Sequence, residues 1–173
     1  MRILLEGRPG AGKSTVARRL ADRLREDGIP VTGFVTEEIR ESGRRLGFSI
    51  ERLDGERGVL AHVEFPGPPR VGRYGIDLAT FERLAIPALE QTGEHHVVII
   101  DELGKMELAS EAFREAVSAL LDRPVLVVAT VQSASHPFTD VLKRRHDIET
   151  LRVATANRDE LPELLAALLR SAR

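Results

Sequence analysis

The residues Gly7-Arg8-Pro9-Gly10-Ala11-Gly12-Lys13-Ser14 match the pattern G-x-x-x-x-G-K-[ST] at every defined position, and Thr15 follows them. A short apolar run precedes this stretch and a segment of helical periodicity follows it. The glycines allow successive backbone N–H groups to converge on phosphate, and the following helix adds its positive N-terminal end. We expect Lys13 to reach the β and γ phosphate oxygens and the Ser14 hydroxyl to ligate Mg²⁺. The alternative is a glycine-rich turn that merely connects a strand to a helix.

Segments of two kinds alternate along the chain. Between strand-length apolar runs lie amphipathic stretches; after the loop, Val16, Leu20, Ala21 and Leu24 share one helical face. This alternation is typical of an α/β protein with right-handed crossovers and a mainly parallel sheet. The predicted strands are Arg2–Glu6, Val31–Thr36, Val97–Ile100, Val125–Thr130 and Leu151–Ala154. Further helices are predicted at Leu78–Gln91, Ser110–Leu121 with Ser110 as N-cap, Pro137–His146 and Asn157–Leu169.

Residues 44–65 break this alternation. They contain two segments of alternating polarity, Leu46–Leu53 and Gly58–Phe65, joined around Asp54-Gly55. This pattern predicts a β-hairpin, which we place as an extension at the edge of the sheet. The following Pro66-Gly67-Pro68-Pro69 predicts a loop. Because no linker or repeat is visible, we expect residues 1–173 to form a single domain with the hairpin as an insertion.

The composition excludes several classes of protein. The chain is 42% hydrophobic and 30% charged with a net charge of −2, which gives no reason to expect nucleic acid or an anionic membrane as a partner. It has no cysteine, so disulfides, thiolate metal sites and cysteine nucleophiles are excluded. No apolar run approaches the roughly 20 residues that span a bilayer, and the N-terminal run is too short for a secretion signal. We therefore expect a soluble, cytoplasmic protein.

Two acidic residues, Asp101 and Glu102, directly follow the apolar run Val97–Ile100. A strand that is apolar on both faces is typical of a parallel sheet covered by helices on each side. Asp101 is therefore expected at the carboxyl edge of the sheet, where its carboxylate can hold Mg²⁺ beside the γ-phosphate. Glu102 is the candidate for orienting and deprotonating the attacking water. The alternatives are a solvated strand end or helix cap for Asp101 and an exposed surface acid for Glu102.

Together, these motifs and the blocks between them resemble the small nucleoside-triphosphatase family of archaea, bacteria and animals, which includes the human cancer-related nucleoside triphosphatase. The resemblance extends from Met1 to Asp159. The blocks that make it specific are Gly33-Phe34-Val35-Thr36-Glu37-Glu38, Gly47-Phe48, Pro69-Arg70-Val71-Gly72-Arg73-Tyr74 and Asp101-Glu102-Leu103-Gly104-Lys105-Met106-Glu107.

The resemblance implies a P-loop NTPase with a RecA/AAA-like, three-layer αβα core. It also implies Mg²⁺-dependent hydrolysis of the γ-phosphate of ATP, GTP, CTP, UTP and TTP with little selectivity for the base. By the same resemblance, Gly7–Ser14 and Val97–Gly104 are the two nucleotide-binding stretches. The second stretch consists of Val97, Val98, Ile99, Ile100, Asp101, Glu102, Leu103 and Gly104.

Weaker candidates are a strand-end hydroxyl and several arginines. Thr130 ends a predicted strand just before Gln132, where a polar side chain can contact the γ-phosphate or the attacking water; the alternative is a plain strand-end hydroxyl. Arg144, within Lys143-Arg144-Arg145-His146, is our candidate for neutralising transition-state charge, with Arg70, Arg73 and Arg145 as competitors. The alternative is a solvated helix end. No aromatic residues are interleaved with these cations, so nucleic acid is not expected.

The segment Asn157-Arg158-Asp159 follows the last predicted strand, in a region where P-loop proteins can contact the base. Asn157 and Glu160 fit a capping box, which explains the segment better than a base-binding motif does. The histidines show no metal-ligand spacing, and we interpret them as surface or packing residues: His62, His95, His96, His136 and His146.

Three functions from different classes remain open. In a nucleoside-triphosphate hydrolase, Lys13 and Ser14 hold the phosphates and metal, Asp101 supports Mg²⁺ and Glu102 activates water. A nucleoside or nucleotide kinase would use the same loop but transfer the phosphoryl group to an acceptor. A slow nucleotide-gated switch would bind partners through the 44–65 hairpin. The adjacent acidic pair favours the hydrolase, and the oligomeric state is not predicted.

Overall fold

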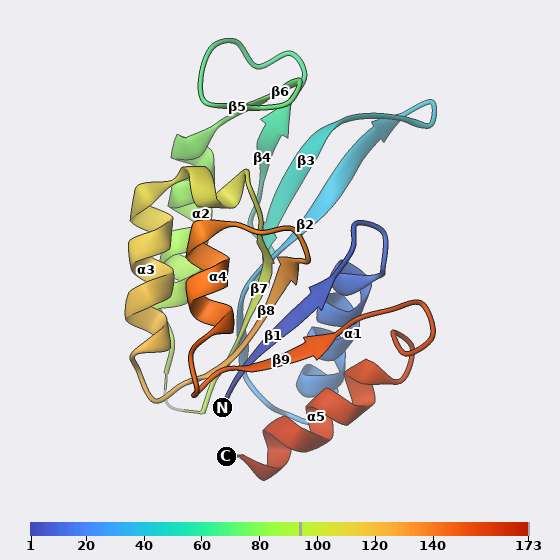
Figure 1. Cartoon of the computed structure of the whole chain (residues 1–173), viewed down its shortest axis with the longest axis vertical. Helices are drawn as coiled ribbons and strands as arrows, with labels where there is room; N and C mark the ends of the chain where they lie inside the picture. Colours follow the sequence, from blue (N-terminus) through green and yellow to red (C-terminus); the bar gives the residue numbers. More distant parts are fainter. Residues whose placement is uncertain (94, 173) are drawn as a thin grey trace.

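The computed structural model describes residues 1–93 and 95–172, which form one nine-stranded sheet flanked by helices (Figure 1). The sheet order is β5-β6-β4-β3-β2-β7-β8-β1-β9. The strands are β1 (Arg2–Gly7), β2 (Val31–Glu41), β3 (Arg44–Arg52), β4 (Arg57–His62), β5 (Arg70–Val71), β6 (Tyr74–Ile76), β7 (Val97–Leu103), β8 (Leu126–Gln132) and β9 (Glu149–Arg152). The helices are α1 (Lys13–Glu26), α2 (Leu78–Glu90), the short 3-10 helix η1 (Glu107–Ala109), α3 (Glu111–Leu121), α4 (Pro137–Lys143) and α5 (Leu161–Ser171).

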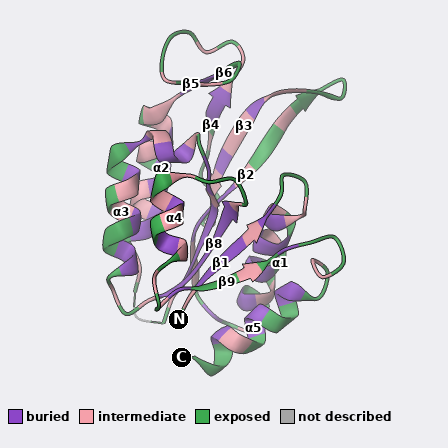
Figure 2. Cartoon of the chain, viewed as in Figure 1, coloured by how far each residue is buried: buried purple, intermediate pink, exposed green. Residues whose placement is uncertain are grey.

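The strands β2, β7, β8, β1 and β9 pair in parallel and separate two hydrophobic cores. Along β7, Val98 and Ile100 face one core, while Val97 and Ile99 face the other. Helices α2, α3 and α4 cover the first core, and α1 and α5 cover the second (Figure 1). The buried residues therefore follow the parallel strands through the centre of the molecule (Figure 2), which confirms the predicted three-layer α/β/α architecture.

Three phenylalanines join the sheet to its first helical layer. Phe34 on β2, Phe81 on α2 and Phe113 on α3 are fully buried, with ring centroids 4.9 to 5.8 Å apart. Their edge-on and tilted orientations are the ones that aromatic quadrupoles prefer. This cluster fixes β2, and hence the strands that continue from it, against α2 and α3.

The antiparallel strands form an arm that extends the sheet beyond β2. The predicted hairpin is confirmed as β3 and β4, although β4 ends at His62. The predicted strand Val31–Thr36 is too short, because β3 pairs with β2 as far as Glu41. The missed turn between β2 and β3 consists of Ser42 and Gly43, both with positive φ, as the twist of a tight hairpin requires. The sequence also missed β5 and β6, which form the outer edge beyond β4.

The C-terminal segment differs most from the prediction. The last strand is β9 at Glu149–Arg152, and α5 starts at Leu161 with Pro162 in its first turn. The capping box predicted for Asn157 and Glu160 is therefore wrong. Asn157 instead accepts a hydrogen bond from the Ala154 N–H and donates one to the Arg152 carbonyl, both at 2.9 Å. By contrast, the predicted Ser110 N-cap is confirmed by its bond from the Phe113 N–H.

Parallel pairing brings the carboxyl ends of β1, β7 and β8 to one edge of the sheet. The phosphate loop, the Asp101-Glu102 pair and Thr130 all lie at this edge, which is where open α/β sheets bind ligands. Among the described residues, no helix is both long enough and apolar enough to cross a bilayer.

A matched pair of leucine truncations tests the two-core packing. Leu84 on α2 is fully buried in the first core, whereas Leu164 on α5 is 54% exposed. We expect Leu84→Ala to lower the free energy of unfolding by about 2–5 kcal/mol, because it leaves a cavity among packed side chains. Leu164→Ala should change it by about 0.5 kcal/mol or less. Urea denaturation measures both, and equal effects would contradict this packing.

Candidate nucleotide-binding site

The phosphate loop connects β1 to α1 through backbone conformations that require glycine. Gly10 and Gly12 have φ values of 78° and 102°, which are strained for any residue with a Cβ. At Gly7, an added Cβ would lie 2.9 Å from the Val153 carbonyl oxygen. Helix α1 begins directly at Lys13 without a side-chain cap, so its first N–H groups are free to bind an anion.

Lys13, the first residue of α1, folds its side chain back onto the start of the phosphate loop. It is 7% exposed, and its ammonium group donates to the carbonyl oxygens of Gly7 at 3.1 Å and Arg8 at 3.4 Å. The same ammonium group lies 3.7 Å from a carboxylate oxygen of Glu102. This position links the phosphate loop to the end of β7.

Asp101 is fully buried at the end of β7 and joins four elements. Its carboxylate accepts hydrogen bonds from the Thr130 hydroxyl on β8 at 2.6 Å and from the Thr36 N–H on β2 at 3.5 Å, and the Ser14 hydroxyl on α1 lies near it. Burial raises the pKa of Asp101 above its usual value, and the hydrogen bonds from Thr130 and Ser14 oppose this shift. The carboxylate thus lies behind the phosphate loop, beside the hydroxyl predicted to share a metal with it.

Glu102 points into the open space in front of the loop. One of its carboxylate oxygens accepts a 2.8 Å hydrogen bond from the Gln132 amide at the end of β8, and the other faces Lys13. Gln132 is in turn anchored by Lys143 on α4, whose ammonium group donates to the Gln132 carbonyl at 3.0 Å and to Glu6 at 2.6 Å. Lys143 therefore supports the site from behind.

A second carboxylate, Glu107 on η1, lies close to Glu102. A Cβ added to Gly104 would meet a carboxylate oxygen of Glu102 at 2.7 Å and one of Glu107 at 2.8 Å, so the two acids flank this glycine. Glu107 is only 5% exposed. Burial and the charge of Glu102 raise the pKa of Glu107 to about 8, so this carboxyl retains its proton near neutral pH.

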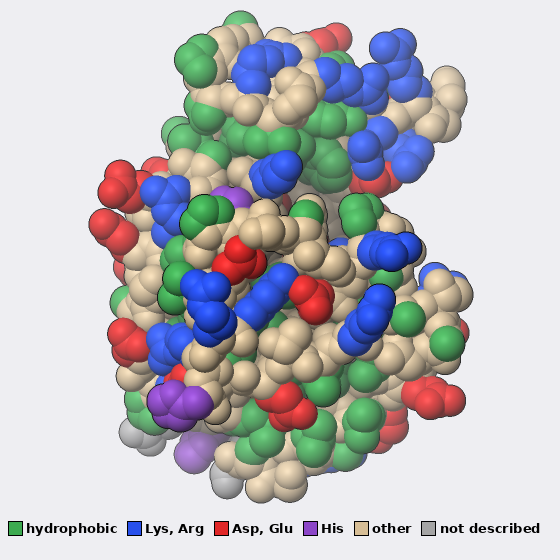
Figure 3. All heavy atoms as spheres, viewed as in Figure 1, with side chains coloured by type: hydrophobic (Ala, Val, Ile, Leu, Met, Phe, Trp, Pro, Cys, Tyr) green, Lys and Arg blue, Asp and Glu red, His purple; other side chains and the backbone are tan. Residues whose placement is uncertain are grey.

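These groups open into a cavity of about 790 Å³ between the body and the strand arm. Figure 3 shows the molecule hollowed between the arm above and the body below, with basic side chains on both sides. The residues that line the cavity are Pro9, Gly10, Gly12, Lys13, Ser14, Thr15, Arg18, Thr36, Glu37, Glu38, Arg40, Arg45, Phe48, Val71, Glu102, Lys105, Met106, Glu107, Gln132 and Arg158.

Not every residue predicted for the site lines this cavity. Val97, Val98, Ile99 and Ile100 are fully buried in the two cores, so their side chains position the acidic pair rather than contact a ligand. Leu103 and Gly104 are also buried. Thr130 is 1% exposed and directs its hydroxyl to Asp101, which makes it a support for that carboxylate.

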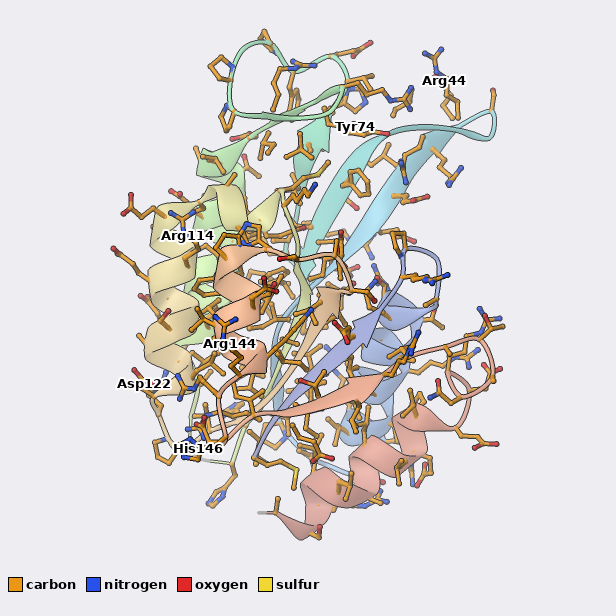
Figure 4. All side chains as sticks on the ribbon, viewed as in Figure 1. Arg44, Tyr74, Arg114, Asp122, Arg144 and His146 are labelled. Carbon is orange, nitrogen blue, oxygen red and sulfur yellow. The ribbon has the colours of Figure 1, made fainter. Side chains whose placement is uncertain are left out.

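The structure does not bring the predicted arginine to the cavity. Arg144 is exposed at the C-terminal end of α4, far from the phosphate loop and outside the cavity lining (Figure 4). Arg145 is paired with Asp122 and Asp147. Arg70 and Arg73 donate to backbone carbonyls of the arm. None of these four arginines lines the cavity. The sequence could not show this, because the position of a residue in the chain does not determine the direction of its side chain in the folded protein.

Lys105 and Arg158 are cations that line the cavity and were not among the predicted site residues. Lys105 lies within the acidic block after β7, and Arg158 lies in the segment interpreted as a helix cap. Gln132 was noted only as a neighbour of Thr130. Glu107 lies in the same block as Lys105, but only the turn at Gly104 shows that its carboxyl faces Glu102.

The raised pKa of Glu107 predicts a pH dependence of stability. Between its ordinary pKa of 4.5 and about 8, the folded state binds more protons than the unfolded state. The contribution of this group to the free energy of unfolding therefore falls as the pH rises through that range. We expect the difference in free energy of unfolding between Glu107→Gln and the wild type to shift in favour of the variant as the pH rises from about 5 to about 9. Urea denaturation at several pH values measures this difference. Glu115→Gln, at an exposed position on α3, should follow the wild type at every pH. Identical curves of stability against pH for the two variants would contradict the raised pKa of Glu107.

Comparison with known proteins places this geometry in a family. A family model described as NTPase matches residues 2–166. Nucleoside-triphosphatase THEP1 of Thermotoga sp. (strain RQ2) is 44% identical over 170 residues, which cover 97% of this chain and 95% of the relative. The human cancer-related nucleoside-triphosphatase is 36% identical over 185 residues, covering 99% and 97%. The crystal structure of THEP1 from the hyperthermophile Aquifex aeolicus has a TM-score of 0.89 at 36% identity, covering 98% of this chain and 99% of that one. The resemblance seen in the sequence is confirmed: the chain belongs to the nucleoside-triphosphatase family.

Proposed function

We propose that this protein hydrolyses the γ-phosphate of nucleoside triphosphates with the help of Mg²⁺. The observation that carries the proposal is the position of Glu102. Its carboxylate faces the cavity, is held at 2.8 Å by Gln132, and lies 3.7 Å from the phosphate-loop lysine. A carboxylate placed beside the group that binds the terminal phosphate can orient and deprotonate a water for in-line attack.

The loop and α1 supply the binding of the triphosphate. The N–H groups of Gly7–Thr15 and the free N-terminus of α1 provide donors for the phosphate oxygens. On binding, Lys13 exchanges its contacts with the Gly7 and Arg8 carbonyls for phosphate oxygens, and it stabilises the charge that develops in the transition state.

Ser14 and Asp101 are the residues that would hold Mg²⁺. They offer a hydroxyl and a carboxylate oxygen near each other, which fits an ion that prefers oxygen ligands and takes few of them from the protein. In the described part of the chain, no group of three or more His, Cys, Asp or Glu is arranged for a metal. An ion held by these two residues would take its other ligands from phosphate oxygens and water, and its charge would neutralise the phosphate oxygens during cleavage. Thr130 and Thr36 keep the Asp101 carboxylate turned toward Ser14.

Broad base tolerance is part of the proposal, with ATP, GTP, CTP, UTP and TTP all as substrates. The family resemblance supports it, and so does the large share of charged side chains among the residues that line the cavity. A phosphotransferase is the second candidate, because the cavity continues past Glu102 to Phe48 and Val71 on the arm, where an acceptor could bind. Free phosphate measured with and without nucleoside acceptors separates the two: acceptor-dependent nucleotide product would favour the kinase.

Glu102→Gln tests the water-activating role. We expect it to reduce Mg²⁺-dependent phosphate release by at least about 100-fold, because the amide cannot take the proton of water. Nucleotide affinity, measured by calorimetry, should remain close to that of the wild type. Glu90→Gln, an exposed position at the end of α2, is the matched control and should hydrolyse normally. Wild-type turnover in Glu102→Gln would exclude this residue as the base.

Lys13→Ala tests the phosphate loop independently. We expect about a 100-fold or greater loss of turnover, because the transition state loses its main cationic partner. Steady-state kinetics with ATP and GTP measure this loss, and unchanged kinetics would refute the proposed binding mode.

A further inference from the structure

We propose that Arg158 binds the nucleoside end of the substrate, with its planar guanidinium group lying against the face of the base. The inference rests on the proposed function, since it assumes that a nucleotide occupies the phosphate loop. It assigns a role to a cavity cation that the hydrolytic mechanism does not use.

The order of the strands sets the direction of the bound nucleotide. β1, which leads into the phosphate loop, lies between β8 and β9. Glu102 and Gln132 lie on the β7–β8 side of the loop, and Lys13 is turned toward Glu102. The terminal phosphate therefore points toward β7 and β8. The opposite end of the nucleotide must leave the loop toward β9 and the segment that follows it, which contains Arg158.

Arg158 lies directly on the phosphate loop. A Cβ added to Gly12 would be 2.8 Å from Arg158 Cδ, so the aliphatic part of the side chain covers this glycine. The side chain also lines the cavity. No hydrogen bond or ion pair joins the guanidinium group to any of the described residues, in contrast to Arg18 and Arg45 on the other side of the cavity.

The segment that carries Arg158 is held in place on both sides. Asn157 bonds to the backbone at Ala154 and Arg152, and the Arg158 N–H donates to the Ala154 carbonyl at 3.1 Å. Asp159 pairs with Arg19 on α1 at 2.7 Å. The side chain thus projects over the loop from a fixed backbone, which reduces the entropy lost when it contacts a ligand.

The chemistry of a guanidinium group fits a substrate with a variable base. It can stack on the π-face that every base has, without reading the hydrogen-bonding groups at the base edge. Among the described residues that line the cavity, the sole aromatic is Phe48 on β3. Because β3 lies beyond β2 and β7, on the side of the terminal phosphate, Phe48 is poorly placed to stack on the same base.

Calorimetry on the full chain tests the assignment with diphosphates that differ only in the nucleoside. We expect Arg158→Ala to weaken the binding of ADP, GDP, CDP and UDP by about 3- to 10-fold each, as lost cation–π stacking would. Pyrophosphate, which has no nucleoside, should bind with nearly unchanged affinity. Arg152→Ala removes the same charge from exposed β9 outside the cavity and should leave all five affinities unchanged. Arg158→Lys should recover only part of the lost affinity, because lysine keeps the positive charge but lacks the planar guanidinium group.

Three results would overturn the inference. If Arg158→Ala weakens the binding of pyrophosphate as much as that of the nucleoside diphosphates, Arg158 contacts the phosphates. If it weakens the binding of only one nucleoside diphosphate, Arg158 forms hydrogen bonds to the edge of that base. Unchanged affinities throughout would remove Arg158 from the site. The proposed hydrolysis is judged separately: if the wild type binds the diphosphates but releases no phosphate from triphosphates, hydrolysis fails while the binding test of Arg158 still stands.

Discussion

The buried carboxylate of Asp101 is the constraint on which the rest of the site depends. A carboxylate without solvent is costly unless hydrogen bonds replace the lost water. Here the bonds come from Thr130 on β8 and Thr36 on β2, and the Ser14 hydroxyl on α1 lies close by. Satisfying this one group therefore fixes β7 relative to the two strands beside it, next to the start of α1. A cation shared with Ser14 would lower the cost of the charge further.

The two hydrophobic cores give this polar edge its rigidity. The parallel strands direct alternate side chains to α1 and α5 on one face and to α2, α3 and α4 on the other. Polar groups are therefore concentrated at the strand ends, where Lys13, Glu102 and Gln132 meet. Lys143 extends the same support from α4 to the ends of β1 and β8. Rigid strands hold such groups more accurately than loops would.

The strand arm and the segment after β9 border the cavity on opposite sides. The arm closes one side of the cavity, with Arg45 and Phe48 fastened to each other and to Tyr74. The segment after β9 brings Arg158 over Gly12 on the other side. The cavity is thus bounded by groups that are far apart in sequence, and Lys13, Glu102 and Gln132 line it between them.

The sequence by itself determined the phosphate loop, the central strands and the identity of the acidic pair, because those features follow from local rules. Glycine conformations, hydrophobic periodicity and strand-end polarity are all properties of short segments. The turn at Ser42-Gly43, which joins β2 to β3, is also a local feature, but its sequence signal is weak. Pairing with β3 is what extends β2 to Glu41. The tertiary structure alone decided which cations face the cavity, that Thr130 bonds to Asp101, and that Asn157 fastens a loop instead of capping α5. These outcomes depend on the directions of side chains on elements that come into contact only after the sheet has formed. The hydrophobic periodicity of the sequence carries no information about those contacts.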